Sequence, residues 1–207
     1  IWYLPAPMDE ETAEVRVLAP MEEETTEAPM REETTEAAAV RVQIRLGHDS
    51  CIVCILGGAS FRNADSEALV KAIAAKLGAL PDLKYKFVTA GMPGVQGTFA
   101  KHCGDGSRVW SLVPRGQQSA YGRGTDIHAG RDSEERKAVF GLVGDVYITV
   151  EGGPGVSQQV QEVYARGAVV VPLQRTGGAS SGLFNFPPRA LQRPRFTSEE
   201  QWSLLAN

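Results

Sequence analysis

Apolar positions from about residue 46 onward follow two alternating patterns. Short continuous apolar runs predict buried strands over 50–56, 85–89, 108–113, 145–150 and 168–173. Between them, apolar residues recur at helical spacing, as in Leu69, Ile73 and Leu77. This spacing predicts helices over 65–77, 97–103, 133–142 and 156–166, and polar loops over 114–131 and 174–195. Ser198 with Gln201 three residues later forms a capping box that predicts a last helix through 205.

The alternation of strands and helices defines the expected fold class. Continuous apolar strands are typical of a parallel sheet that is covered on both faces. We therefore predict an α/β, Rossmann-like domain over 46–207, with a parallel β-sheet and helices on both sides. Ligands of such sheets bind outside the carboxyl ends of the strands.

Residues 1–45 have a different composition and are predicted to form an extended acidic tail. One phrase occurs three times, at 6–12, 19–25 and 28–34, and it is rich in proline and glutamate. Such a segment has too few large apolar residues to offset its chain entropy. Two interpretations remain open: a disordered tail, or an arm that orders on a protein partner through its methionines and residues 1–4.

Composition narrows the functional classes. A net charge of −4 offers no general attraction for nucleic acid, and no apolar run is long enough to span a membrane. Cys51 and Cys54 have a redox-like spacing, but they lie inside an apolar strand, so we interpret them as buried strand residues. The histidines and cysteines lack metal-site spacing, and the dinucleotide fingerprint is incomplete, so neither a metal nor a cofactor is expected. We expect a cytoplasmic protein, with an organelle as the alternative because the sequence starts at Ile1 without methionine.

Two glycine-rich turns provide the main indication of function in the sequence. Residues 151–157 follow one predicted strand and open an amphipathic helix, and residues 90–97 follow another predicted strand. A strand that passes through a glycine turn into a helix presents unpaired backbone N–H groups beside a helix N-terminus, which suits phosphate. Two such turns in one chain favour a nucleotide or sugar-phosphate site.

Four motifs follow one another along the chain. Gly57 and Gly58 end the first predicted strand, and a glycine loop spans 91–97. Arg136 and Lys137 lie in the predicted helix before residues 151–159. In this order the motifs resemble those of the LONELY GUY cytokinin-activating phosphoribohydrolases, which have GGxxGxMG, an RK pair and PGGxGTxxE at these places. The resemblance covers roughly 48–180.

The resemblance implies a site for a nucleoside monophosphate. Members of the family usually form dimers, so it also implies a homodimer. Arg136, Gln159 and Glu162 become the candidates for catalysis. The candidates for phosphate or nucleotide binding are Gly58, Gly91, Gly94, Gly97, Arg115, Lys137, Gly152, Gly153, Gly155, Val156 and Ser157.

This chain departs from the motif at three positions, with Glu151 for proline, Val156 for threonine and Gln159 for the closing glutamate. The family uses that glutamate to cleave the bond between base and ribose 5-phosphate, and a neutral amide cannot accept a proton at pH 7. Glu162 and Glu151 are the candidate replacements. We therefore expect a nucleotide-binding protein with weakened catalysis, acting as a sensor or an accessory subunit. The alternative is an active phosphoribohydrolase.

Overall fold

The apolar runs predicted as strands form one parallel sheet. The computed structural model describes residues 33–81, 83–195 and 197–206. Its six strands lie in the order β4-β3-β2-β1-β5-β6, and every neighbouring pair is parallel. The strands are β1 (Cys51–Gly57), β2 (Tyr85–Thr89), β3 (Val109–Val113), β4 (Thr125–His128), β5 (Val146–Val150) and β6 (Val169–Leu173). The predicted α/β Rossmann-like fold is confirmed.

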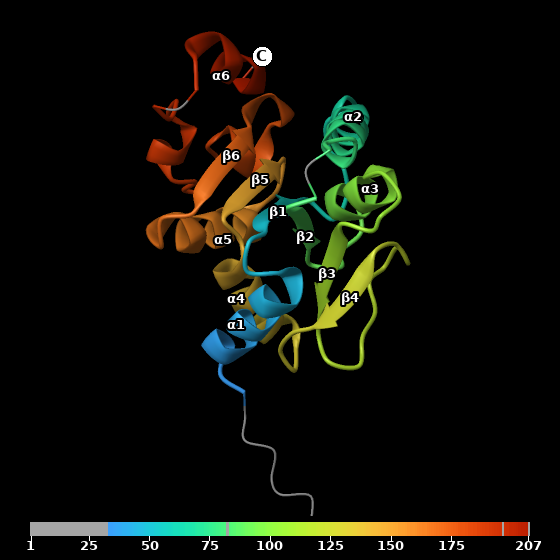
Figure 1. Ribbon diagram of the computed structural model, residues 1–207. Coiled ribbons are helices and arrows are strands. Elements are labelled where there is room, and N and C mark those ends of the chain that lie inside the picture. Colours follow the sequence, from blue (N-terminus) through green and yellow to red (C-terminus); the bar gives the residue numbers. More distant parts are fainter. Residues whose placement is uncertain (1–32, 82, 196, 207) are drawn as a thin grey trace, which may run out of the picture. The chain divides into compact units, whose positions relative to one another are not determined.

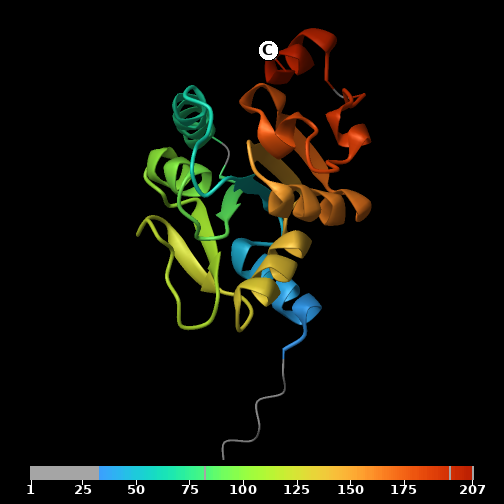
Figure 2. The ribbon, with the colours of Figure 1, turned by 180° about the vertical axis from the view of Figure 1, so that it is seen from behind.

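Helices cover both faces of the sheet (Figures 1 and 2). The helices are α1 (Thr35–Leu46), α2 (Ser66–Gly78), α3 (Val95–His102), α4 (Ser133–Val143), α5 (Pro154–Ala165) and α6 (Glu199–Ala206). One core cluster joins α1, α4 and α5 to one face through residues such as Val42, Phe140 and Val160. A second cluster joins α2 and α3 to the other face through residues such as Val70 and Phe99. The sheet is therefore covered on both faces, and the edge where the strands end is the place at which such sheets bind ligands.

Helix α1 is packed in the core, although nearly all of it lies within the predicted tail. Thr34 caps it by accepting a hydrogen bond from the Ala37 N–H at 3.2 Å. Val42 and Leu46, on its inner face, are buried in the first core cluster. The predicted tail boundary at residue 45 therefore falls inside a packed helix, because the last part of the supposed tail has its own apolar face. Residues 1–32, which carry most of the predicted tail, lie outside the described residues.

The predicted loop at 114–131 contains strand β4, which the sequence did not reveal. Strand β4 pairs with β3 at the edge of the sheet, and of its four residues only Ile127 is buried. A single buried residue gives no alternating or continuous apolar pattern. The predicted loop at 174–195 likewise contains three short 3₁₀ turns, η1 (Gln174–Thr176), η2 (Gly178–Ser181) and η3 (Pro188–Leu191).

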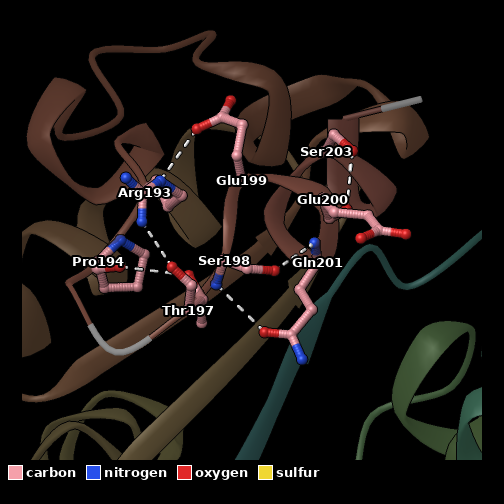
Figure 3. Close-up of polar contacts among 8 residues, drawn as sticks. All are labelled: Arg193, Pro194, Thr197, Ser198, Glu199, Glu200, Gln201 and Ser203. Carbon is pink, nitrogen blue, oxygen red and sulfur yellow. Dashed lines mark hydrogen bonds and ion pairs between the residues drawn. The ribbon is translucent and has the colours of Figure 1, made fainter.

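The predicted capping box is present at the start of α6 (Figure 3). The Ser198 N–H donates to Gln201 Oε1 at 3.2 Å, and the Gln201 N–H donates to Ser198 Oγ at 3.1 Å. Arg193 braces the same turn through an ion pair with Glu199 at 3.0 Å. Two backbone donors that the helix leaves unpaired are thereby satisfied.

The cysteines of β1 are strand residues, as interpreted from the sequence. Cys54 is fully buried in the sheet and Cys51 is half-buried at its start. Burial raises the pKa of both thiols. No helix among the described residues is both long and apolar enough to cross a membrane.

Candidate functional site

The turn after β5 has the open geometry that an anion needs. Proline starts α5, where a missing N–H costs nothing, and Gly153 stands at the cap position without a side chain to cover the helix end. The N–H groups of Val156 and Ser157 both reach the Gly153 carbonyl at 3.1 Å. Those of Gly153 and Gly155 have no acceptor in the described part of the chain. A Cβ on either glycine would have no atom of the described residues within 4 Å, so none of their side chains crowds these two positions.

A cleft of about 270 Å³ lies beside this turn. It is lined by Leu56, Gly57, Ala90, Met92, Gln96, Arg136, Lys137, Gly155, Val156 and Gln159. The lining therefore combines the ends of β1 and β2, the start of α3, and the first two turns of α4 and α5. Among the described residues this lining includes two cationic side chains and no carboxylate, which makes the cleft attractive to an anion.

Arg136 is the chemically unusual residue of the cleft. Its side chain is 91% buried, with 9% relative exposure, and Nη1 donates to the Ala90 carbonyl at 2.6 Å. Its Nε is buried without a partner in the described part of the chain. Burial lowers the pKa of Arg136, and the charge of Glu134 opposes that shift. A guanidinium nevertheless stays protonated in proteins, so the fold holds a desolvated positive charge that has no ion pair with a carboxylate of residues 33–81, 83–195 or 197–206.

Lys137 and Gln159 both line the cleft, and a hydrogen bond joins them. Gln159 is buried, and its Nε2 donates to the Lys137 carbonyl at 3.2 Å. Its amide is thus used to join α5 to α4. Lys137 reaches Glu134 only at 3.9 Å, and the Glu134 side chain is 85% exposed, so this ion pair is weak.

Glu151 is a structural residue in this fold, with no free carboxylate oxygen. Its two oxygens accept from the backbone N–H groups of Arg62 at 2.8 Å and Asn63 at 3.0 Å. The residue is 2% exposed, and its own N–H donates to Thr176 Oγ1 at 2.8 Å. The carboxylate ties the loop after β1 to the end of β5. It does not line the cleft, so the geometry speaks against Glu151 as a replacement base.

Three other sequence candidates lie away from the cleft. Glu162 is exposed on α5 and accepts from Gln158 Nε2 at 3.3 Å. Arg115 is exposed just after β3, where its N–H binds the Gly130 carbonyl at 3.0 Å. Ser157 is fully buried in the first turns of α5, and its hydroxyl has no partner in the described part of the chain. None of the three lines the cleft.

The second glycine loop serves packing more than ligand binding. Gln96 Oε1 accepts from the Ala90 N–H at 2.8 Å and from the Met92 N–H at 3.3 Å. The Val95 N–H is bound by the Gly58 carbonyl at 3.1 Å. These three donors are therefore already used.

Gly58, Gly91 and Gly94 stand where a side chain would collide, and Gly97 stands where it would be tight. A Cβ on Gly94 would lie 2.4 Å from the Ala59 backbone carbon, and one on Gly97 would lie 3.1 Å from the Tyr121 ring. One on Gly58 would lie 2.8 Å from the Ser60 carbonyl oxygen, and one on Gly91 2.9 Å from a Val113 methyl group. The glycines allow close packing at the sheet edge, while Met92 and Gln96 of the same loop, which the sequence did not single out, line the cleft.

Comparison with known proteins supports the fold. No model of a protein family matches the chain, and no curated protein matches it either. Among solved structures, the X-ray structure of TM1055, a structural genomics target, is similar with a TM-score of 0.51 and 17% identity. That match covers 73% of this chain and 88% of TM1055.

A second similar structure is the molybdenum cofactor carrier protein of Chlamydomonas reinhardtii. It matches with a TM-score of 0.46 and 16% identity, over 58% of this chain and 75% of the carrier. The likeness to TM1055, at 17% identity, shows a shared fold alone. The chain therefore belongs, by architecture, among Rossmann-like α/β proteins.

Proposed function

We propose that this chain binds a nucleoside monophosphate, or a related phosphorylated nucleotide, in the cleft beside the turn after β5. The supporting observation is the buried guanidinium of Arg136: within the part of the chain that the structure describes, its Nε is unpaired and its cleft is lined by no carboxylate. Phosphate oxygens would accept from the N–H groups of Gly153 and Gly155 at the positive end of α5. The resemblance to LONELY GUY phosphoribohydrolases supplies the nucleotide as the expected carrier of that phosphate.

Catalysis is expected to be weak, because the cleft lacks a group that accepts a proton at neutral pH. Cleavage of an N-glycosidic bond passes through a cationic sugar, which a nearby carboxylate stabilises. Gln159 occupies the corresponding motif position, and Glu151 and Glu162 are engaged or exposed elsewhere. Loss of general acid–base help costs about 10²- to 10⁴-fold in rate.

A protein that binds this ligand without efficient turnover suits the role of a sensor or an accessory subunit. The resemblance also leads us to propose a homodimer. The alternative function, an active phosphoribohydrolase, requires a carboxylate that reaches the cleft in the bound state.

Adenosine monophosphate is a suitable first ligand for testing this proposal. We expect saturable binding by calorimetry, and little release of free adenine by chromatography. Arg136→Ala removes the buried charge and should weaken affinity at least about tenfold, since hydrogen bonds to charged groups contribute about 1.5–3 kcal/mol. Arg115→Ala is the matched control, because it removes an exposed arginine outside the cleft, and it should leave affinity unchanged.

Gln159→Glu distinguishes the two functions. It restores a carboxylate at the motif position and should raise adenine release by about 10²-fold or more. Efficient turnover by the unmodified chain that disappears in Arg136→Ala would instead establish the active enzyme. Absence of saturable binding to any nucleoside monophosphate would contradict both.

A further inference from the structure

A second pocket, of about 240 Å³, lies at the N-terminus of α2. It is lined by Asn63, Asp65, Ser66, Leu69, Arg175 and Thr176. These residues come from the loop after β1, the first turn of α2 and η1, which follows β6. The pocket thus lies at the edge where the strands end, and it shares no lining residue with the Arg136 cleft.

The N-terminus of α2 has no side-chain cap from the residues that the structure describes. Asp65 occupies the cap position in a helical conformation (φ −86°, ψ −16°), and its carboxylate makes no capping hydrogen bond. The Leu69 N–H binds the Asp65 carbonyl at 3.1 Å. The N–H groups of Glu67 and Ala68 have no acceptor within the described ranges. The first turn therefore presents two unpaired donors and the positive end of a 13-residue helix.

Ser66 gives an independent indication of a ligand. The residue is 99% buried, with 1% relative exposure, and its Oγ has no partner in the described part of the chain. A hydroxyl that is buried without a hydrogen bond destabilises the fold. Ser66 lines the pocket, so a bound acceptor there would satisfy the hydroxyl.

Arg175, in η1, supplies positive charge to the pocket lining. The residue is exposed, and its carbonyl accepts from Asn63 Nδ2 at 3.5 Å. Its guanidinium has no partner among the residues that the structure describes. The one opposing charge in the lining belongs to Asp65, which is exposed.

We infer that this pocket is a second anion site, which takes a small tetrahedral oxyanion of the phosphate class. The oxyanion accepts hydrogen bonds from the N–H groups of Glu67 and Ala68 and from the Ser66 hydroxyl. Arg175 pairs with its charge. Asp65 limits the affinity through repulsion, which keeps the site weak and reversible.

The test is a titration of the full chain with inorganic phosphate at constant ionic strength, followed through backbone amide resonances. Saturable shifts are expected at Glu67 and Ala68. Arg175→Ala should weaken the phosphate affinity by roughly tenfold, as expected for a lost charge-assisted hydrogen bond. Arg189→Ala, an exposed arginine outside both pockets, is the matched control and should leave the affinity unchanged.

Two further variants separate this site from its rivals. Asp65→Asn removes the repulsion and should raise the phosphate affinity severalfold, whereas a cation site would be weakened by the same change. Ser66→Ala should weaken phosphate binding while leaving the melting temperature without phosphate unchanged or higher. A lower melting temperature in Ser66→Ala would show that the hydroxyl serves the fold, and would overturn the inference.

The two proposed anion sites are distinguished by which backbone amide resonances shift when phosphate is added. Shifts at Gly153 and Gly155 alone would overturn the site at α2 and leave the nucleotide cleft intact. Shifts at Glu67 and Ala68 alone would support the site at α2 without supporting the cleft. Equal weakening by Arg175→Ala and Arg189→Ala would show that only an adventitious ion binds, and would also overturn the inference.

Discussion

Glu151 holds a backbone conformation that ordinarily favours glycine. Its φ is 50°, a value that few side chains adopt and that proline, fixed near −65°, cannot reach. The proline of the resembled motif is therefore incompatible with the turn as this chain forms it. The strain is offset by the two backbone donors of Arg62 and Asn63, which bind the Glu151 carboxylate. One substitution at this position thus changes both the turn and the loop that it holds.

Replacing Glu151 by glutamine tests this role. Glu151→Gln leaves one acceptor oxygen for two backbone donors, so we expect the free energy of unfolding to fall by about 1–2 kcal/mol. Urea unfolding measures the change. Glu162→Gln is the control, since Glu162 is exposed, and its effect should stay within about 0.5 kcal/mol. Equal stability of Glu151→Gln and the unmodified chain would contradict a tethering carboxylate.

At the scale of single residues, part of the candidate site could be predicted from the sequence. The glycine turn after β5 and the position of Arg136 follow from local pattern and motif order. The tether from Glu151 to Asn63 joins residues 88 positions apart, and no local pattern marks it. The unpaired hydroxyl of Ser66 is equally invisible, because serine at a helix start is common and its lack of a partner depends on tertiary packing.

Helices α2 and α3 approach each other at their carboxyl ends through glycine. A Cβ on Gly78 would lie 2.4 Å from the Gly104 nitrogen, so the two backbones touch there. Arg108 closes the same corner by donating to the carbonyls of Leu77 and Gly78. The packing of this helix pair against the sheet therefore depends on a missing side chain.

Gly78→Ala should lower the free energy of unfolding by about 1–3 kcal/mol, because the backbones must separate to admit a methyl group. Gly155→Ala is the matched control in another helix. A Cβ there has no atom within 4 Å, and alanine should raise the free energy of unfolding by about 0.5–1 kcal/mol through helix propensity. Thermal unfolding of both variants gives the comparison, and a stabilising Gly78→Ala would contradict the close contact.

At the scale of elements, continuous apolar runs sufficed for five of the six strands. Strand β4 escaped because it is a short edge strand whose other residues are at least partly exposed. Helix α1 escaped for another reason. Ala38, Val42 and Leu46 recur at helical spacing and are buried, but they follow directly on the acidic repeat and share its alanine and glutamate composition. The composition that this segment shares with the acidic repeat therefore concealed its helical periodicity.

Charge is distributed unevenly over the whole molecule. The complete chain carries a net charge of −4, yet the cleft is lined by Arg136 and Lys137 without a carboxylate. A nucleotide is therefore repelled weakly at long range and attracted at short range. Short-range attraction by partly buried charges is screened less than surface pairs, but it still weakens with salt.

We expect the affinity for adenosine monophosphate to fall about three- to tenfold as sodium chloride rises from about 0.05 M to about 0.5 M. Arg136→Ala should flatten this dependence, because it removes the buried half of the attraction. Calorimetric titrations at several salt concentrations measure both slopes. An affinity that rises with salt would mean that apolar contacts dominate, and would contradict an anion-binding cleft.

Strand order has a consequence for how the chain is made. The central strand β1 pairs with β2 on one side and with β5 on the other, and the Asp145 carboxylate that binds the Ile52 N–H lies 93 positions further along. During synthesis, the strands from β1 to β4 leave the ribosome before β5 does. The edge of β1 that pairs with β5 is therefore unpaired over that interval, and an unpaired strand edge can pair with other chains. Pairing with β5 covers that edge of β1, and the open edge is then that of β5 until β6 pairs with it.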